Sequence, residues 1–152
     1  MSRYSKGISL LENLLFFWCG LTLILLIGGD NLVIPSWLQV AGRMHPLMLH
    51  FPIVLLLLAI ALLWMKEENW RGFGKNLLLI GANFTGITVV AGLILASEDY
   101  EGDALAWHKW LGVVSLGFSV FIYFFLDKVA NLYRLAGSGL AVLILLTGHF
   151  GA

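Results

Sequence analysis

Four histidines are the side chains of this sequence best suited to chemistry: His45, His50, His108 and His149. Neutral imidazole is a good ligand for haem iron, copper and zinc. A b-type haem held between helices needs axial ligands on both faces of a flat macrocycle, usually from different helices. The four histidines fall in three separate apolar segments, so all four are candidate haem-iron ligands. The sequence does not give their pairing, although His50 with His108 or His149 suits the expected depths best.

The first two histidines belong to the segment HPLMLHFPI at 45–53. Pro46 suits the first position of a helix, where its missing N–H costs nothing, and this places His45 at the helix entrance. His50 then lies about 7 Å deeper, with its imidazole about 140° around the helix from that of His45. The two rings should therefore not chelate one small ion. Pro52 deprives the carbonyl of Met48 of its usual donor, which predicts a kink in this turn.

A kinked, polar turn inside lipid normally faces the interior of a helix bundle. Small residues also occur where a neighbouring helix or a macrocycle edge would need room, namely Ala82, Gly86, Gly112, Gly117, Gly137 and Ala141. Small residues four apart in membrane helices more often serve helix packing alone. A copper or zinc site is the alternative use of the histidines. A copper(I) path is disfavoured because methionine and cysteine clusters are lacking, with Met44 and Met48 the only nearby thioethers.

The elements that position these histidines are predicted to be membrane helices. The chain has 152 residues, of which 60% are hydrophobic and 12% charged, whereas a soluble domain is nearer half apolar and a quarter charged. Five apolar segments are long enough for a bilayer about 30 Å thick: 10–28, 47–65, 77–96, 106–126 and 134–150. We therefore expect an all-α, integral membrane bundle of about five transmembrane helices, forming a single membrane domain over 1–152.

Lysine and arginine are distributed unevenly between the two predicted sides. Seven lie in the N-terminal tail and in the loops after the second and fourth spans, and two, Arg43 and Lys109, lie on the other side. The positive-inside rule then predicts a cytoplasmic N-terminus and a periplasmic C-terminus, with all four histidines near the outer face. Arg3 and Lys6 before the first span also suit a signal peptide, but no small-residue cleavage site follows, which favours a retained helix.

Several other functions find little support. Cys19 is the single cysteine and no Cys-x-x-Cys-His sequence occurs, so a covalent c-type haem of that kind is excluded. The acidic connection at 97–103 does not match an EF-hand loop and is expected to be a solvated loop. The net charge of zero favours no nucleic-acid partner. Nucleophile-elbow, zinc-protease and phosphate-loop motifs are all missing, so a stand-alone enzyme is not favoured.

Three motifs resemble those of an uncharacterised family of bacterial inner-membrane domains. They are HPLMLHFPI at 45–53, WHKWLGV at 107–113 and TGHFGA at 147–152, which match the patterns HPxxxHFP, HxWLG and TGHxG. The resemblance covers a four-helix core at about 45–150 and leaves the helix at 10–28 as an addition. It implies a multi-pass protein of the bacterial inner membrane. Members of that family are often joined to planctomycete-type cytochrome c domains or accompany Rieske proteins.

These observations leave three functions open. The first is a redox module that holds b-type haem through the histidines and exchanges electrons with quinol and a cytochrome c or Rieske partner. The second is a non-catalytic anchor or assembly subunit of a respiratory or cytochrome complex, in which the histidines specify packing. The third is a copper or zinc site. The chain ends where longer members of the family continue into a cytochrome, so we expect either a shortened form or a partner on another chain.

Overall fold

The computed structural model describes residues 3–29, 34–96, 102–125 and 130–151. Over these residues the chain is helical and has no β-strand. In chain order the helices are α1 (Arg3–Gly28), α2 (Ser36–Arg43), α3 (His45–Met48), α4 (His50–Leu63), α5 (Glu68–Ala96), α6 (Asp103–Phe125) and α7 (Ala130–Phe150). Most of the acidic connection at 97–103, and Lys128 in the connection after α6, lie outside the described residues.

The helices have the length and composition of membrane spans. Among the described residues, α1, α5, α6 and α7 each contain a stretch long and apolar enough to cross a bilayer. The second predicted span, 47–65, falls in two segments, 36–48 and 50–63, that meet at an angle of 44°. The prediction of an all-α fold is confirmed for the described residues, with four helices, or five if the bent pair is one span, long and apolar enough to cross a membrane.

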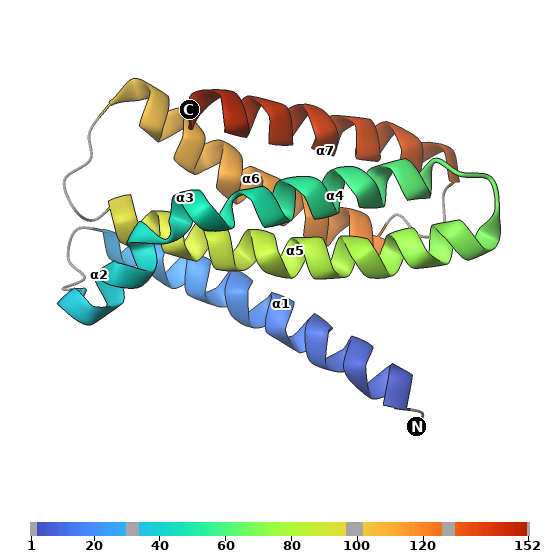
Figure 1. Ribbon diagram of the computed structural model, residues 1–152, viewed down its shortest axis with the longest axis horizontal. Helices are drawn as coiled ribbons and strands as arrows, with labels where there is room; N and C mark the ends of the chain where they lie inside the picture. The colour runs from blue at the N-terminus through green and yellow to red at the C-terminus, as the bar shows by residue number, and fades with distance from the viewer. Residues whose placement is uncertain (1–2, 30–33, 97–101, 126–129, 152) are drawn as a thin grey trace.

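Helix α5 lies at the centre of the bundle (Figure 1), with α1, α2, α4 and α6 packed around it. The most apolar stretch of α5 is 67% buried inside the protein, against 11% for α1 and 28% for each of α6 and α7. Helix α7 completes the bundle by packing on α6 and α4. The outer helices therefore leave large apolar surfaces for lipid, as expected for a small membrane protein.

The N-terminus and the C-terminus lie at opposite ends of the bundle (Figure 1). The N-terminus of α1, the α4–α5 connection and the start of α7 lie at one end. Helices α2 and α3, the start of α6 and the end of α7 lie at the other. All four histidines belong to this second end, since they sit at the start of α3, α4 and α6 and near the end of α7.

The bend at the second span lies where the proline pattern predicts it. Helix α3 ends at Met48 and α4 begins at His50, and the angle between the flanking segments is 44°. Pro52 has no N–H to offer the carbonyl of Met48, so the hydrogen-bond ladder is interrupted at this turn. The amide of Ile53 reaches the carbonyl of Leu49 only at 3.5 Å. The bend gives α3 and α4 different directions at the histidine end.

The sequence did not predict the short helix α2, which lies in the connection between the first two spans. It begins after Pro35, whose carbonyl accepts hydrogen bonds from the amides of Leu38 and Gln39 at 2.8 and 3.2 Å. It packs on α5 through Gly42, where an added Cβ would lie 2.9 Å from the backbone nitrogen of Leu95. Its eight residues are too few to cross a membrane, and their contact with α5 explains why this segment is ordered against the bundle.

Small residues bring the helices together elsewhere in the bundle. An added Cβ at Gly86 of α5 would lie 2.6 Å from the Cβ of Trp18 on α1, so these helices approach closely there. A Cβ at Gly137 of α7 would lie 3.4 Å from a side-chain carbon of Ile60 on α4. These glycines serve helix packing, the reading that small-residue spacing most often has in membrane proteins.

Candidate haem or metal site

His45 is buried at the start of α3 and is held by α5. Its side chain is 9% exposed, and its Nδ1 lies 2.8 Å from the backbone carbonyl oxygen of Thr88. A carbonyl can only accept, so Nδ1 carries the proton and donates it. Gly92, four residues after Thr88, makes this approach possible, because an added Cβ there would lie 2.8 Å from Cε1 of His45.

His108 is held in the same way by the second pair of helices. It lies on α6, is also 9% exposed, and its Nδ1 donates to the carbonyl oxygen of Thr147 on α7 at 2.8 Å. Thr147 lies in the last turn of α7, where carbonyls have no partner within the helix. Gly151, four residues later, again leaves room, because a Cβ there would lie 2.5 Å from Nδ1 and Cε1 of His108.

The same pattern holds both histidines. In each, the threonine carbonyl of a Thr-x-x-x-Gly sequence accepts a hydrogen bond from the imidazole N–H. In both cases the threonine hydroxyl donates to the carbonyl four residues earlier, from Thr88 to Phe84 at 2.8 Å and from Thr147 to Leu143 at 2.7 Å. The histidine precedes its threonine by 43 residues in one case and by 39 in the other. Two helical hairpins therefore each present one imidazole in the same manner.

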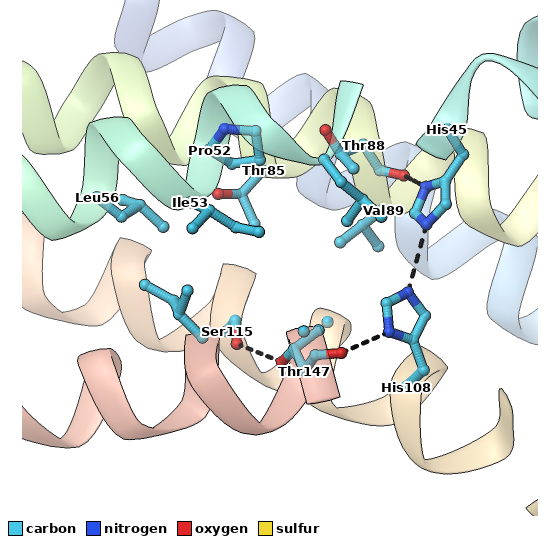
Figure 2. Close-up of a pocket in the computed structure, with 14 residues that line it drawn as sticks. His45, Pro52, Ile53, Leu56, Thr85, Thr88, Val89, His108, Ser115 and Thr147 are labelled. Atoms are coloured by element: carbon cyan, nitrogen blue, oxygen red, sulfur yellow. Dashed lines mark hydrogen bonds between the residues drawn. The ribbon is translucent and has the colours of Figure 1, made fainter. Parts of the chain in front are cut away.

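The two imidazoles face each other across the bundle (Figure 2). Their Nε2 atoms are 3.3 Å apart, the ring centroids are 5.6 Å apart, and the ring planes are nearly perpendicular at 84°. Since each Nδ1 is a donor, neutral rings present a lone pair at each Nε2. Two facing lone pairs repel, so the arrangement becomes favourable when a proton or a metal ion lies between them. The fixed tautomer is the one that metal-bound histidines commonly have.

Apolar cavities lie on both sides of the line that joins the two Nε2 atoms. The inner cavity, of about 60 Å³, extends toward Pro52, Leu56 and Ile144 (Figure 2). The outer cavity, of about 240 Å³, extends toward Leu105 and Lys109. Both are lined by five of the same residues, His45, Leu49, Val89, His108 and Gly112. Together they form a slot between the two hairpins, with the histidine pair across it.

The other two predicted ligands are not part of this slot. His50 and His149 are exposed on the outside of the bundle and line neither cavity. The structure does not bring His50 together with His108 or His149, the pairing that the depths favoured, and the neighbour of His108 is His45. The depth argument favoured His50, but its rotation of about 140° from His45 turns it away from the bundle interior.

The donor set distinguishes between the kinds of group the slot can hold. Structural zinc sites usually have four protein ligands and catalytic ones three. Among the described residues, no group of three or more His, Cys, Asp or Glu side chains is placed to hold a metal ion. A haem brings its own four nitrogens and needs two axial ligands from the protein. Two opposed imidazoles with an apolar slot on either side fit that requirement.

The distance between the two Nε2 atoms argues against haem and for a small ion. With metal–nitrogen bonds of about 2.0–2.1 Å, ligands on opposite sides of one ion are about 4 Å apart. The separation of 3.3 Å between the Nε2 atoms instead matches the angle of about 107° that a tetrahedral ion would impose. A haem therefore requires the two Nε2 atoms to separate by about 0.7 Å, and it also requires the hairpins to open around the macrocycle, because cavities of about 60 and 240 Å³ are smaller than a porphyrin. An ion would instead require a third and a fourth ligand.

Sequence reasoning found both imidazoles but missed the groups that hold them. The rings are held by two Thr-x-x-x-Gly sequences, Thr88 with Gly92 and Thr147 with Gly151. The signal in the sequence was this pattern, repeated about forty residues after a histidine. Protein-family models, curated proteins and solved structures give no match to this chain. The resemblance to the bacterial membrane family therefore stays a prediction from three motifs.

Proposed function

We propose that the protein is a membrane redox subunit that holds one b-type haem between His45 and His108. The observation that carries the proposal is the opposed pair of Nε2 atoms, 3.3 Å apart, with each ring fixed through Nδ1 to a backbone carbonyl. A haem bound there would supply one-electron transfer. Of the four predicted iron ligands, the proposal retains these two.

The residues around the pair have separate roles in this proposal. The carbonyls of Thr88 and Thr147 fix the tautomer and orientation of the rings and raise the basicity of Nε2. The apolar walls exclude water, which favours a low-dielectric redox site. Lys109 is the one charged side chain among the described residues that line the slot, and it offers a counter-charge to the carboxylates of a macrocycle edge.

The expected topology determines which redox partners could reach the site. The positive-inside rule places the histidine end at the periplasmic face of the bacterial inner membrane. A quinol in the bilayer and an external cytochrome c or Rieske protein are then the proposed redox partners. The resemblance in the three histidine motifs supports this choice by association.

An absorption spectrum tests the proposal directly. The full chain is expressed with ample haem, purified in detergent and measured in the oxidised and dithionite-reduced forms. We expect Soret and α bands of a six-coordinate b-type haem, in a ratio of one haem to one chain. A preparation with no such bands, from cells that assemble other b-type cytochromes, would refute the haem assignment.

A zinc or copper ion is the second candidate, because the Nε2 separation of 3.3 Å suits a tetrahedral ion without movement. Elemental analysis of the same preparation separates the two. One equivalent of zinc or copper that is lost in the His108→Ala variant would replace haem by an ion site. If neither haem nor metal is bound, the histidine pair is a packing contact, and the anchor or assembly role is the one supported.

A further inference from the structure

A basic cleft lies at the end of the bundle opposite the histidine pair. It has a volume of about 490 Å³ and is lined by Leu63, Lys66, Glu68, Arg71, Gly72, Lys75 and Tyr133. A smaller cavity of about 120 Å³ shares Leu63, Lys66 and Arg71 with it and adds Met65 and Arg134. Four cationic side chains from α5, α7 and the α4–α5 connection thus line these two neighbouring cavities.

Within the described part of the chain, cationic side chains outnumber carboxylates in the lining of the cleft. Glu68 is the one carboxylate that lines it within the described part of the chain. No described carboxylate forms an ion pair with Lys66, Arg71 or Arg134. The ammonium of Lys75 lies 5.4 Å from the ring centroid of Tyr123. Like charges gathered around one space repel one another, so an anion bound between them would stabilise the cleft.

The surroundings of the cleft indicate where the anion comes from. Two of its lining residues are buried, since Leu63 and Tyr133 are 5% and 4% exposed. Trp64 and Trp70, both exposed, are next in sequence to lining residues, on the α4–α5 connection and near the start of α5. Tryptophans at span ends mark the level of the lipid headgroups. The cleft is therefore at headgroup depth, in the leaflet that the charge distribution predicts to be cytoplasmic.

We propose that this cleft binds the headgroup phosphate of an anionic phospholipid. The guanidinium of Arg71 can bind phosphate oxygens through two parallel N–H bonds, and Lys66 adds a compact charge. The exposed apolar surface beside Trp64 and Met65 offers a path for the acyl chains. Basic pockets between membrane helices on the cytoplasmic side are suited to this ligand class. The proposal is independent of the histidine site at the other end.

Lipid titration of the full chain in detergent tests the proposal. Short-chain phosphatidylglycerol, phosphatidylcholine of the same chain length and inorganic phosphate are added separately. Bound lipid is counted by native mass spectrometry, and the melting temperature is measured in parallel. We expect one phosphatidylglycerol per chain and a higher melting temperature, with little effect of phosphatidylcholine. An equal effect of phosphatidylcholine or of inorganic phosphate would overturn the assignment to an anionic lipid.

Variants locate the lipid. Arg71→Gln and Lys66→Gln should each weaken phosphatidylglycerol binding about fivefold, the loss expected for one cation at a lipid surface. Lys6→Gln is the matched control. Lys6 lies near the start of α1, at the same end of the bundle as the cleft, but it does not line the cleft. Equal weakening in Lys6→Gln would mean general surface attraction and would overturn the site. If a variant is less stable, the number of bound lipids per chain still reports binding, because it does not depend on the melting temperature.

Discussion

At the scale of single residues, the histidine pair depends on what lies behind each ring. His45 and His108 reach carbonyl oxygens at 2.8 Å, and each reaches its carbonyl across a glycine. The other two histidines have the same chemistry, but they are exposed and line no cavity. Burial and a hydrogen bond from Nδ1 to a backbone carbonyl, rather than residue type, therefore distinguish the two candidate ligands from His50 and His149.

Removal of either facing imidazole tests the proposed haem site. His45→Ala and His108→Ala would each remove one of the two proposed ligands of the iron, so we expect loss of the six-coordinate reduced spectrum. His50→Ala and His149→Ala are the matched controls, and both should keep the spectrum and the haem content of the parent. Absorption and pyridine-haemochrome assays check the result. If His50→Ala lost the haem while His45→Ala kept it, the assigned pair would be wrong.

The glycines behind the rings provide a subtler test. In Gly151→Ala the new Cβ would lie 2.5 Å from two atoms of His108, and in Gly92→Ala it would lie 2.8 Å from Cε1 of His45. Each ring must then move away from its carbonyl. We expect haem affinity to fall about 10- to 100-fold, the loss typical when the hydrogen bond that orients a metal-binding histidine is removed.

Gly117→Ala is the control for both glycine variants, because a Cβ at Gly117 would have no heavy atom within 4 Å. Alanine is also favoured over glycine inside a helix, by up to about 1 kcal/mol. Gly117→Ala should therefore keep the affinity of the parent in a haem titration. Unchanged haem affinity in both Gly92→Ala and Gly151→Ala would show that the hydrogen bonds to the two carbonyls do not position the rings.

At the scale of helices, α1 is attached to the rest of the bundle mainly through α5. Asn83 donates from Nδ2 to the carbonyl of Leu11 at 3.1 Å, and Gly86 lets Trp18 approach. Near the same end of α1, the hydroxyl of Tyr123 on α6 donates to Glu12 at 2.8 Å. None of these contacts reaches the slot, so the attachment of α1 and the histidine site should respond separately to mutation.

Gly86→Leu should displace α1 and leave the site intact. A Cβ at position 86 would lie 2.6 Å from the Cβ of Trp18, so a larger side chain overpacks the α1–α5 contact. Overpacking costs about 1–3 kcal/mol, and we expect the melting temperature in detergent to fall by several degrees. Gly117→Leu, in open space, should change it little. Loss of the haem spectrum in Gly86→Leu would contradict the separation of the two regions.

At the scale of the whole molecule, the sequence predicted the spans well because bilayer thickness and apolar length are directly linked. The bend near Pro52 was also predictable, since it follows from one missing N–H. The pairing of the histidines was not, because it depends on how α6 rotates against α3, which no local pattern specifies. The helix at 36–43 was missed because its order comes from the contact of Gly42 with α5, far away in sequence.

The orientation of the bundle in the membrane decides which compartment the histidine pair faces. Lys6, Lys66, Arg71, Lys75 and Arg134 belong to α1, to α5 and its preceding connection, and to α7, all of which begin at one end of the bundle. The positive-inside rule predicts that this end is cytoplasmic. In that orientation the slot would open toward the periplasm, the side expected for the proposed cytochrome or Rieske partner.

Fusions to alkaline phosphatase test this orientation, because the enzyme becomes active only where its disulfides form, outside the cytoplasm. A fusion after Ala152 or after Gly102 should be active, and a fusion after Met65 should be inactive. A green fluorescent protein at the same three positions should give the reverse pattern, which controls for poor expression. Phosphatase activity after Met65 with none after Ala152 would mean that the histidine pair faces the cytoplasm. The electron partners would then have to be sought among cytoplasmic proteins, and the basic cleft would face the outer leaflet.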